Sequence, residues 1–126
     1  MNKQEALSIS EFNNNNNNSD RILINKMDNH RLILYRLIIG APKLGIDLNS
    51  IKIALKSHNI YLNTNTLKYH IGILIDYDLI SRVYEGKGRG KCSFYKATER
   101  GVKIFEKFID LIEYKLVTIN EKQTTI

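Results

Sequence analysis

The sequence has little of the chemistry that cross-links a chain or carries it through a membrane. Its 126 residues include one cysteine, one proline and no tryptophan. A single cysteine excludes an intrachain disulfide and a cysteine-rich metal site. No apolar run approaches the roughly 18 residues that a membrane-spanning helix requires, and the N-terminus lacks the apolar core of a secretory signal. We therefore expect a cytoplasmic protein without a membrane partner.

Groups arranged for catalysis or metal binding are also missing from the pattern. No Ser-His-Asp or paired-carboxylate arrangement is visible, which predicts a protein that is not an enzyme and uses no cofactor. His30, His58 and His70 fall on different predicted helices without a nearby ligand pair, so no metal site is expected. Cys92 stands alone, and it is either an inert thiol or a redox switch.

What is present is an ordinary core and an excess of positive charge. Hydrophobic residues make up 43% of the chain and charged residues 25%, which is typical of a globular protein. The length suffices for one domain with a modest core. The net charge of +6 favours a polyanionic partner, and simple solubility is the alternative interpretation.

The chain begins with an arm and a buried helix. Residues 1–19 contain an unbroken asparagine run that has nothing to bury, so we expect a disordered arm. Residues 20–27 are apolar and allow either a strand or a helical turn. Residues 28–39 are apolar on most faces, which is typical of a buried helix. Asp28 or Asn29 caps this helix, and Gly40 ends it.

A short strand and a second helix follow. Residues 46–48 are predicted to form the strand, and Asn49 or Ser50 is expected to cap the helix after it. The side chains that face inward from this helix should be Ile51, Ala54 and Leu55.

Residues 63–101 organise the rest of the chain, and they begin with a third helix. Thr64 or Asn65 is expected to cap it, because a short side-chain oxygen accepts one of the unpaired backbone N–H groups. Polar-tipped residues lie off its apolar stripe, and the helix should end near Asp78. The stripe is Leu67, Ile71 and Leu74, and the outward residues are Thr66, Lys68, Tyr69 and His70.

Two short predicted strands, residues 81–84 and 92–97, flank a glycine-rich basic loop. The ten residues from Arg82 to Lys91 carry a net charge of +3, and glycines alternate with the cations. Glycine lets a backbone approach a groove closely. The pattern favours a nucleic-acid contact, and a solvated hairpin tip is the alternative.

These elements resemble the reading helix and wing of winged helix-turn-helix DNA-binding domains, above all the MarR, PadR and ArsR groups of prokaryotic transcription regulators. Residues 66–71, Leu74 and the sequence Asp-Leu-Ile at 78–80 are similar to a helix whose end usually reads Gly-Leu-Ile. Residues 95–101, Tyr-Lys-Ala-Thr-Glu-Arg-Gly, are similar to the Tyr-x-Leu-Thr-x-x-Gly segment after the wing. The resemblance covers roughly residues 28–101. It implies an α+β, mainly α, winged-helix domain over residues 20–97, with a three-helix core and a two-stranded wing.

Three positions depart from that family pattern. Asp78 replaces the glycine, and aspartate tolerates the left-handed helix-ending conformation better than most residues. Ala97 replaces the leucine and leaves a smaller core contact. Residues 57–63 form a longer connection than compact helix-turn-helix units have, which affects the angle of the third helix.

The last predicted helix spans residues 98–119, with Thr98 as its candidate N-cap, and a flexible tail is expected at 120–126. A second apolar stripe, made by Ile104, Phe108 and Leu111, lies beside a heptad seam, so one stripe is left for a second copy of the chain. We expect a coiled-coil homodimer. The seam is Val102, Phe105, Ile109, Ile112, Leu116 and Ile119.

The resemblance implies a homodimeric transcription regulator that binds double-stranded DNA in a sequence-specific manner. The third helix would enter the major groove, and the wing would contact the backbone or the minor groove. A winged-helix module for protein–protein contact and a single-strand or RNA binder are the alternatives. No small-molecule effector is indicated. The residues expected to contact DNA are Ser50, Asn63, Thr64, Asn65, Thr66, Lys68, Tyr69, His70, Arg82, Lys87, Arg89 and Lys91.

Overall fold

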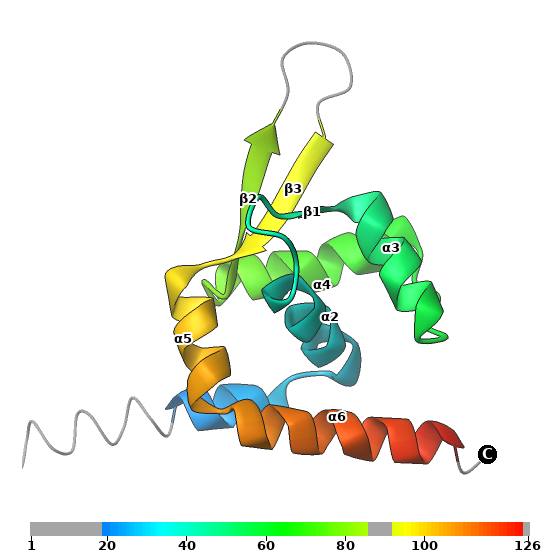
Figure 1. Cartoon of the computed structure of the whole chain (residues 1–126), viewed down its shortest axis with the longest axis vertical. Helices are drawn as coiled ribbons and strands as arrows, with labels where there is room; N and C mark the ends of the chain where they lie inside the picture. Colours follow the sequence, from blue (N-terminus) through cyan, green and yellow to red (C-terminus); the bar gives the residue numbers. More distant parts are fainter. Residues whose placement is uncertain (1–18, 86–91, 125–126) are drawn as a thin grey trace, which may run out of the picture.

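The computed structural model describes residues 19–85 and 92–124 (Figure 1). The predicted arm, apart from its last residue, lies outside these ranges, as do the loop cations Lys87, Arg89 and Lys91. Within the described ranges, no helix has the length and apolar character needed to cross a bilayer.

Three helices and a preceding helical segment form the body of the domain. Residues 19–26 are helical, which decides between the two structures that the sequence allowed there. The three helices match the predicted ones in number and order, and they are α2 (Asn29–Ile39), α3 (Leu48–Ser57) and α4 (Thr64–Asp76).

Each of these helices begins at a side chain that accepts a hydrogen bond from the first turn. The carboxylate of Asp28 accepts one from the His30 N–H at 2.8 Å, as predicted. Asp47 caps α3 and Asn63 caps α4, so the predicted caps, one to three residues later, were wrong. Asp47 and Asn63 have the extended backbone that a cap requires, whereas the residues after them already belong to the helices.

The sheet has three antiparallel strands in the order β1-β3-β2. Its strands are β1 (Ile46–Asp47), β2 (Ile80–Glu85) and β3 (Cys92–Ala97). The short strand β1 pairs with the base of β3, where Ile46 is opposite Tyr95. Strands β2 and β3 form a hairpin that projects beyond the helices (Figure 1). The predicted two-stranded wing is therefore anchored by a third strand.

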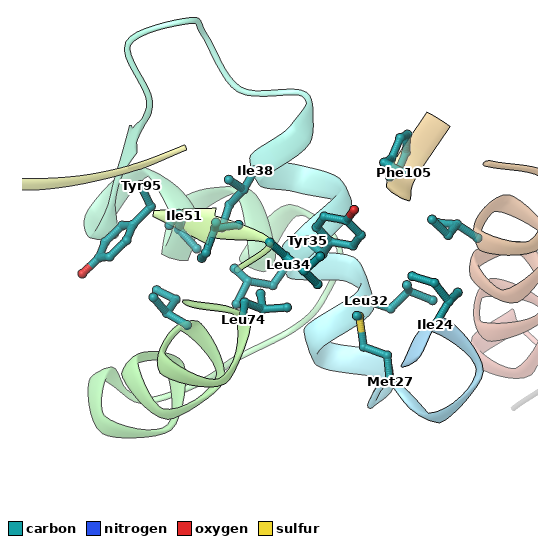
Figure 2. Packing of buried hydrophobic residues seen from close by; sticks show 14 of the residues in the cluster. Ile24, Met27, Leu32, Leu34, Tyr35, Ile38, Ile51, Leu74, Tyr95 and Phe105 are labelled. Atoms are coloured by element: carbon teal, nitrogen blue, oxygen red, sulfur yellow. The ribbon is translucent and has the colours of Figure 1, made fainter. Parts of the chain in front are cut away.

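Helix α2 lies at the centre of the core and contacts α3, α4, α5, α6 and β3. Its side chains Leu32, Leu34, Tyr35 and Ile38 are buried, and Figure 2 shows several of them among residues from the other elements. A helix that is covered on most sides needs apolar residues on most faces, as its sequence has.

A hydrogen-bonded junction joins the sheet to α5 (Glu99–Lys107). The Thr98 hydroxyl donates to the Asp78 carbonyl at 2.6 Å and accepts from the Gly101 N–H at 2.9 Å, which confirms Thr98 as the N-cap. The Thr98 N–H donates to the Leu79 carbonyl at 3.0 Å. The Tyr35 hydroxyl donates to the Gly101 carbonyl, and burial raises the pKa of this hydroxyl, so it keeps its proton.

Asp78 adopts the left-handed conformation expected for it, with φ of 59°. Aspartate carries a Cβ that disfavours this conformation, and glycine does not. We expect the Asp78→Gly variant to be more stable than Asp78→Ala by about 1 kcal/mol in urea unfolding. Equal stabilities would mean that the turn relaxes to another conformation at no cost.

The predicted single helix over residues 98–119 was wrong. The chain turns at Phe108, where φ is −114° and ψ is 26°, and α6 (Ile109–Thr124) leaves in a new direction (Figure 1). Phe108 is buried at this turn. The turn also brings the Lys115 ammonium to the carbonyls of Ile24 and Asn25, each at 2.8 Å, and burial lowers the pKa of this ammonium. These tertiary contacts form because the chain turns at Phe108 and does not continue as one helix.

Of the tail expected at 120–126, the residues up to Thr124 are part of α6, and residues 125 and 126 lie outside the described ranges.

Candidate nucleic-acid interface

Helix α4 has one buried face and one open face. The predicted stripe of Leu67, Ile71 and Leu74 is buried against the rest of the core. A helix turns by about 100° per residue, so a different set of side chains lies on the opposite side. That set is Asn65, Lys68, Tyr69, Gly72 and Asp76.

The N-terminal half of this open face carries groups suited to nucleic acid. Asn65, Lys68 and Tyr69 are exposed, and the side chains of Asn65 and Lys68 make no hydrogen bond or ion pair with other described residues. The first turn has no acidic residue, so nothing there neutralises the positive end of the helix. Asp76 lies at the far end, where its carboxylate would repel a phosphate.

Gly72 is a feature of this face that sequence analysis missed. A Cβ placed on Gly72 would have no heavy atom within 4 Å, so the helix core does not require a glycine there. Glycine inside a helix costs roughly 0.5–1 kcal/mol relative to alanine. Because Gly72 has no side chain, another molecule can come close to the backbone of α4 between Lys68 and Asp76.

His70 does not belong to the open face, and its place among the predicted DNA contacts was wrong. Its side chain is only 8% exposed. It lies on the side of α4 that faces α2, with its ring centroid 6.1 Å from that of His30. His70 follows Leu67 by three residues, which places the two side chains on the same face of a helix. Because histidine is polar, the sequence pattern placed His70 on the exposed side of the helix.

Three other predicted contacts already take part in hydrogen bonds within the chain. Asn63 accepts a hydrogen bond from the Thr66 N–H at 2.8 Å. The Ser50 hydroxyl donates to the Asp47 carboxylate, and this hydrogen bond holds the pKa of Asp47 below its usual value. The hydroxyl of Thr64 accepts a hydrogen bond from the ammonium of Lys52, a cation that sequence analysis did not select.

A hollow of about 350 Å³ opens between α3, α4 and β3. It brings Lys68 of α4 close to Lys52 of α3, although the two cations lie far apart in the sequence. The residues that line the hollow are Asp47, Leu48, Asn49, Lys52, Lys68, Ser93 and Tyr95.

The positively charged surface at the hollow extends onto the β2–β3 hairpin. Arg82 is exposed, and its guanidinium lies 5.7 Å from the centroid of the Tyr95 ring, across the strand pair. Tyr95 also lines the hollow, so it links Arg82 to Lys68. The remaining predicted wing cations are outside the described residues. We call the surface formed by Asn65, Lys68, Gly72 and Arg82 the basic face.

The predicted dimer seam divides between the core and the surface. Phe105 and Ile112 are buried within the domain, so they were wrongly placed at an interface between copies. Val102 and Ile109 are exposed, Leu116 is half-buried, and the Ile119 side chain is not among those described. The turn at Phe108 causes this division, because α5 and α6 face the core at different angles. Figure 1 shows α6 and the hairpin at opposite ends of the molecule.

This arrangement of helices, anchored hairpin and open helix face matches a known architecture. The chain has a winged-helix fold. Neither a family model nor a curated protein matches the sequence, but solved structures match over most of the chain. The Staphylococcus aureus MepR–DNA complex is 16% identical, covers 98% of this chain and 94% of MepR, and has a TM-score of 0.59.

Two further winged-helix structures are similar. A PadR-like transcription factor from Bacteroides fragilis is 21% identical and covers 90% of this chain and 97% of its own, with a TM-score of 0.53. A possible HxlR-family transcriptional factor from Thermoplasma volcanium is 20% identical and covers 74% and 76%, with a TM-score of 0.52. These matches confirm the winged-helix fold that the resemblance implied.

Proposed function

We propose that this winged-helix protein is a transcription regulator that binds double-stranded DNA as a homodimer. In this proposal α4 enters the major groove, and the hairpin with its loop contacts the phosphate backbone or the minor groove. The open face of α4 is the single observation that carries the proposal. Its Asn65 and Lys68 side chains have no partner among the described residues, and both residue types read base edges in the major groove.

The shape of the face supports the same function. Gly72 leaves a gap between Lys68 and Asp76 on the outer surface of α4, so a groove wall can come close to the helix there. Lys52, Lys68 and Arg82 place positive charge on three neighbouring elements. Such cations neutralise phosphates and supply most of the affinity that does not depend on sequence.

The similarity to a regulator whose structure was solved with DNA also supports the proposal. MepR is described as a transcription regulator, and it covers nearly the whole of this chain. At 16% identity the likeness concerns the fold, so the argument for DNA rests on the side chains of the basic face.

We propose that the second copy of the chain binds on α5 and α6. Both helices carry exposed apolar side chains, and α6 lies at the end of the molecule away from the hairpin, so dimerisation there would leave the basic face free. A two-fold dimer would present two reading helices to half-sites about one helical turn apart. The exposed residues are Val102, Ile109, Tyr114 and Val117.

Exposed aromatic rings favour single-stranded nucleic acid as a second candidate. Tyr61 is 73% exposed and lies just before α4, and Tyr69 is 64% exposed and lies in the N-terminal half of that helix. Unpaired bases stack on such rings. A winged-helix module that contacts only proteins would bind neither form of nucleic acid.

A salt series with matched duplex and single-stranded DNA tests the proposal. If two protomers together neutralise about 6 to 8 phosphates, the logarithm of affinity should fall with the logarithm of salt at a slope of roughly −5 to −7. Tighter binding to single strands would favour the second candidate. No binding to either form at low salt would favour the protein-contact module.

Two alanine variants should separate the contribution of α4 to DNA binding from that of the wing. Lys68→Ala should narrow the affinity gap between operator and random duplex by about 1–3 kcal/mol, because Lys68 donates to a base edge. Arg89→Ala should weaken both duplexes by a similar factor and reduce the salt slope by about one unit per wing. Electrophoretic mobility shifts on both duplexes measure these effects.

Lys26→Ala is the matched control for these two variants. Lys26 is an exposed cation near the end of the 19–26 helix, beside α6 and away from the hairpin. Its loss should change neither the affinity gap nor the salt slope by as much. If Arg89→Ala removes the sequence preference and Lys68→Ala preserves it, then the wing reads the sequence.

A further inference from the structure

Three potential metal ligands come together at the start of α2. Asp28 and His30 belong to the cap and first turn of that helix, and His70 projects from α4. One ligand atom from each residue lies within 4.8 Å of the other two. Sequence analysis placed His30 and His70 on different helices, as they are, and it could not show that the packing of α2 against α4 brings them together.

One ring nitrogen of His70, the Nδ1, has no hydrogen-bond partner among the described residues. The side chain is 92% buried, and this nitrogen is covered. Buried polar groups are nearly always satisfied, and an unsatisfied one is costly. The ring makes aromatic contacts with His30 and Tyr69, but these contacts do not satisfy a ring nitrogen. The Nε of Arg31 is likewise buried without a partner in the described part of the chain, but the His70 ring lies beside two other potential metal ligands.

We propose that Asp28, His30 and His70 bind one divalent transition-metal ion of the zinc class. Two imidazole nitrogens and one carboxylate oxygen suit Zn²⁺, Co²⁺ or Ni²⁺ better than Mg²⁺ or Ca²⁺, which prefer all-oxygen sites. Three protein ligands leave a fourth position for water or another molecule. No catalytic step is assigned to this site.

The distances between the three ligand atoms allow a metal ion to bind after small side-chain movements. Bonds of about 2.0–2.1 Å to a tetrahedral zinc ion place ligand atoms closer together than 4.8 Å. Asp28 and His30 are exposed and can rotate, whereas His70 is held in the core. Asp28 is already oriented, because its Oδ1 accepts the hydrogen bond that caps α2. The buried histidine would then define the position of the ion.

The charges around His70 suit a neutral ligand. Burial lowers the pKa of His70, and Arg31 and His30 lower it further, while the negative charge of Asp28 acts in the opposite direction. A neutral imidazole is the form that binds a metal. Arg31 places a positive charge nearby, which opposes a bound cation, and the Asp28 carboxylate offsets it.

The test is titration of Zn²⁺ against a chromophoric chelator, using the full chain with Cys92→Ser so that the thiol does not compete. We expect one ion per chain with micromolar affinity or tighter. His30→Ala should weaken binding by at least about 10-fold, as the loss of even an indirect ligand contact does. His58→Ala is the matched control and should not change binding, because His58 is exposed at the end of α3.

Two further measurements separate metal binding from damage to the fold. Asp28→Asn keeps a side chain that caps helices but removes the charge, so it should weaken Zn²⁺ binding while the melting temperature in chelator stays close to that of the parent. Saturating Zn²⁺ should raise the melting temperature of His58→Ala and leave that of His30→Ala unchanged. Co²⁺ should show absorption bands of a low-coordinate site in the parent and in His58→Ala, but not in His30→Ala.

The proposal fails if the parent chain does not bind one Zn²⁺ per chain at micromolar concentration. It also fails if His30→Ala and His58→Ala bind equally well. In either case the histidine pair would be an aromatic contact alone. These measurements contain no DNA, so their outcome is independent of the proposed regulatory function.

Discussion

Replacing Gly101 by alanine should lower the free energy of unfolding by about 3 kcal/mol or more. A Cβ at this position would lie 2.0 Å from the Leu79 carbonyl oxygen and 2.9 Å from its carbon. These are backbone atoms, and the same oxygen accepts the hydrogen bond from the Thr98 N–H. The N–H and carbonyl of Gly101 are bonded to Thr98 and Tyr35, so neither side can move away without breaking the junction.

Gly72→Ala is the matched control for this prediction. It makes the same chemical change in a helix, but the new Cβ meets no heavy atom within 4 Å. We expect it to stabilise the fold by about 0.5–1 kcal/mol, because alanine has the higher helix propensity. Thermal unfolding measures both, and Gly101→Ala should lower the midpoint by roughly 12 °C or more. Equal midpoints for the two variants would contradict the close approach of α5 to Leu79.

The second large effect is expected at the proposed dimer surface. Changing Ile109 and Val117 to lysine together should convert the dimer to a monomer, because two positive charges per protomer would have to be buried between the copies. Ile109 is 43% exposed and Val117 is 52% exposed, so the folded monomer should tolerate both changes. Losing the second reading helix should weaken binding to a two-half-site operator by roughly 100-fold or more. Sedimentation and DNA titration measure the two effects.

Two single variants serve as controls for the dimer experiment. Leu44→Lys changes an exposed apolar residue outside α5 and α6, so the dimer should persist. Ile112→Lys should instead unfold the domain, because Ile112 is completely buried in the core of its own chain. A wild-type protein that sediments as a monomer at micromolar concentration would refute the dimer, as would a double variant that stays dimeric.

Local sequence patterns were sufficient for the three core helices and the hairpin strands, but not for the turn between α5 and α6. Leu67, Ile71 and Leu74 recur at the helical period, and all three are buried on one face of α4, as predicted. Thr98 and Gly101 are three residues apart, which is the spacing of a cap and the N–H group that it accepts. Such features depend on neighbours within one turn, so they can be recognised without knowing the rest of the fold.

The caps of α3 and α4 show the limit of local patterns. Several short polar residues occur in succession before each helix, and any of them can accept a backbone hydrogen bond. Asp47 and Asn63 are the caps because the chain is extended at both positions, at the end of β1 and at the end of the connection between α3 and α4. The exact start of a helix therefore depends on how the chain enters it.

The amino-acid sequence by itself determined the three core helices and the two strands that flank a basic loop, because periodicity and turns act over short distances, and the winged-helix fold followed from the resemblance of these segments to known regulators. Only the tertiary structure decided that His70 meets His30, that the chain turns at Phe108, and that Phe105 and Ile112 enter the core. A helical period shows which side chains share a face, but the neighbour that covers the face is distant in sequence. Burial is a property of that packing, so the site at Asp28, His30 and His70 emerges only when α2 lies against α4.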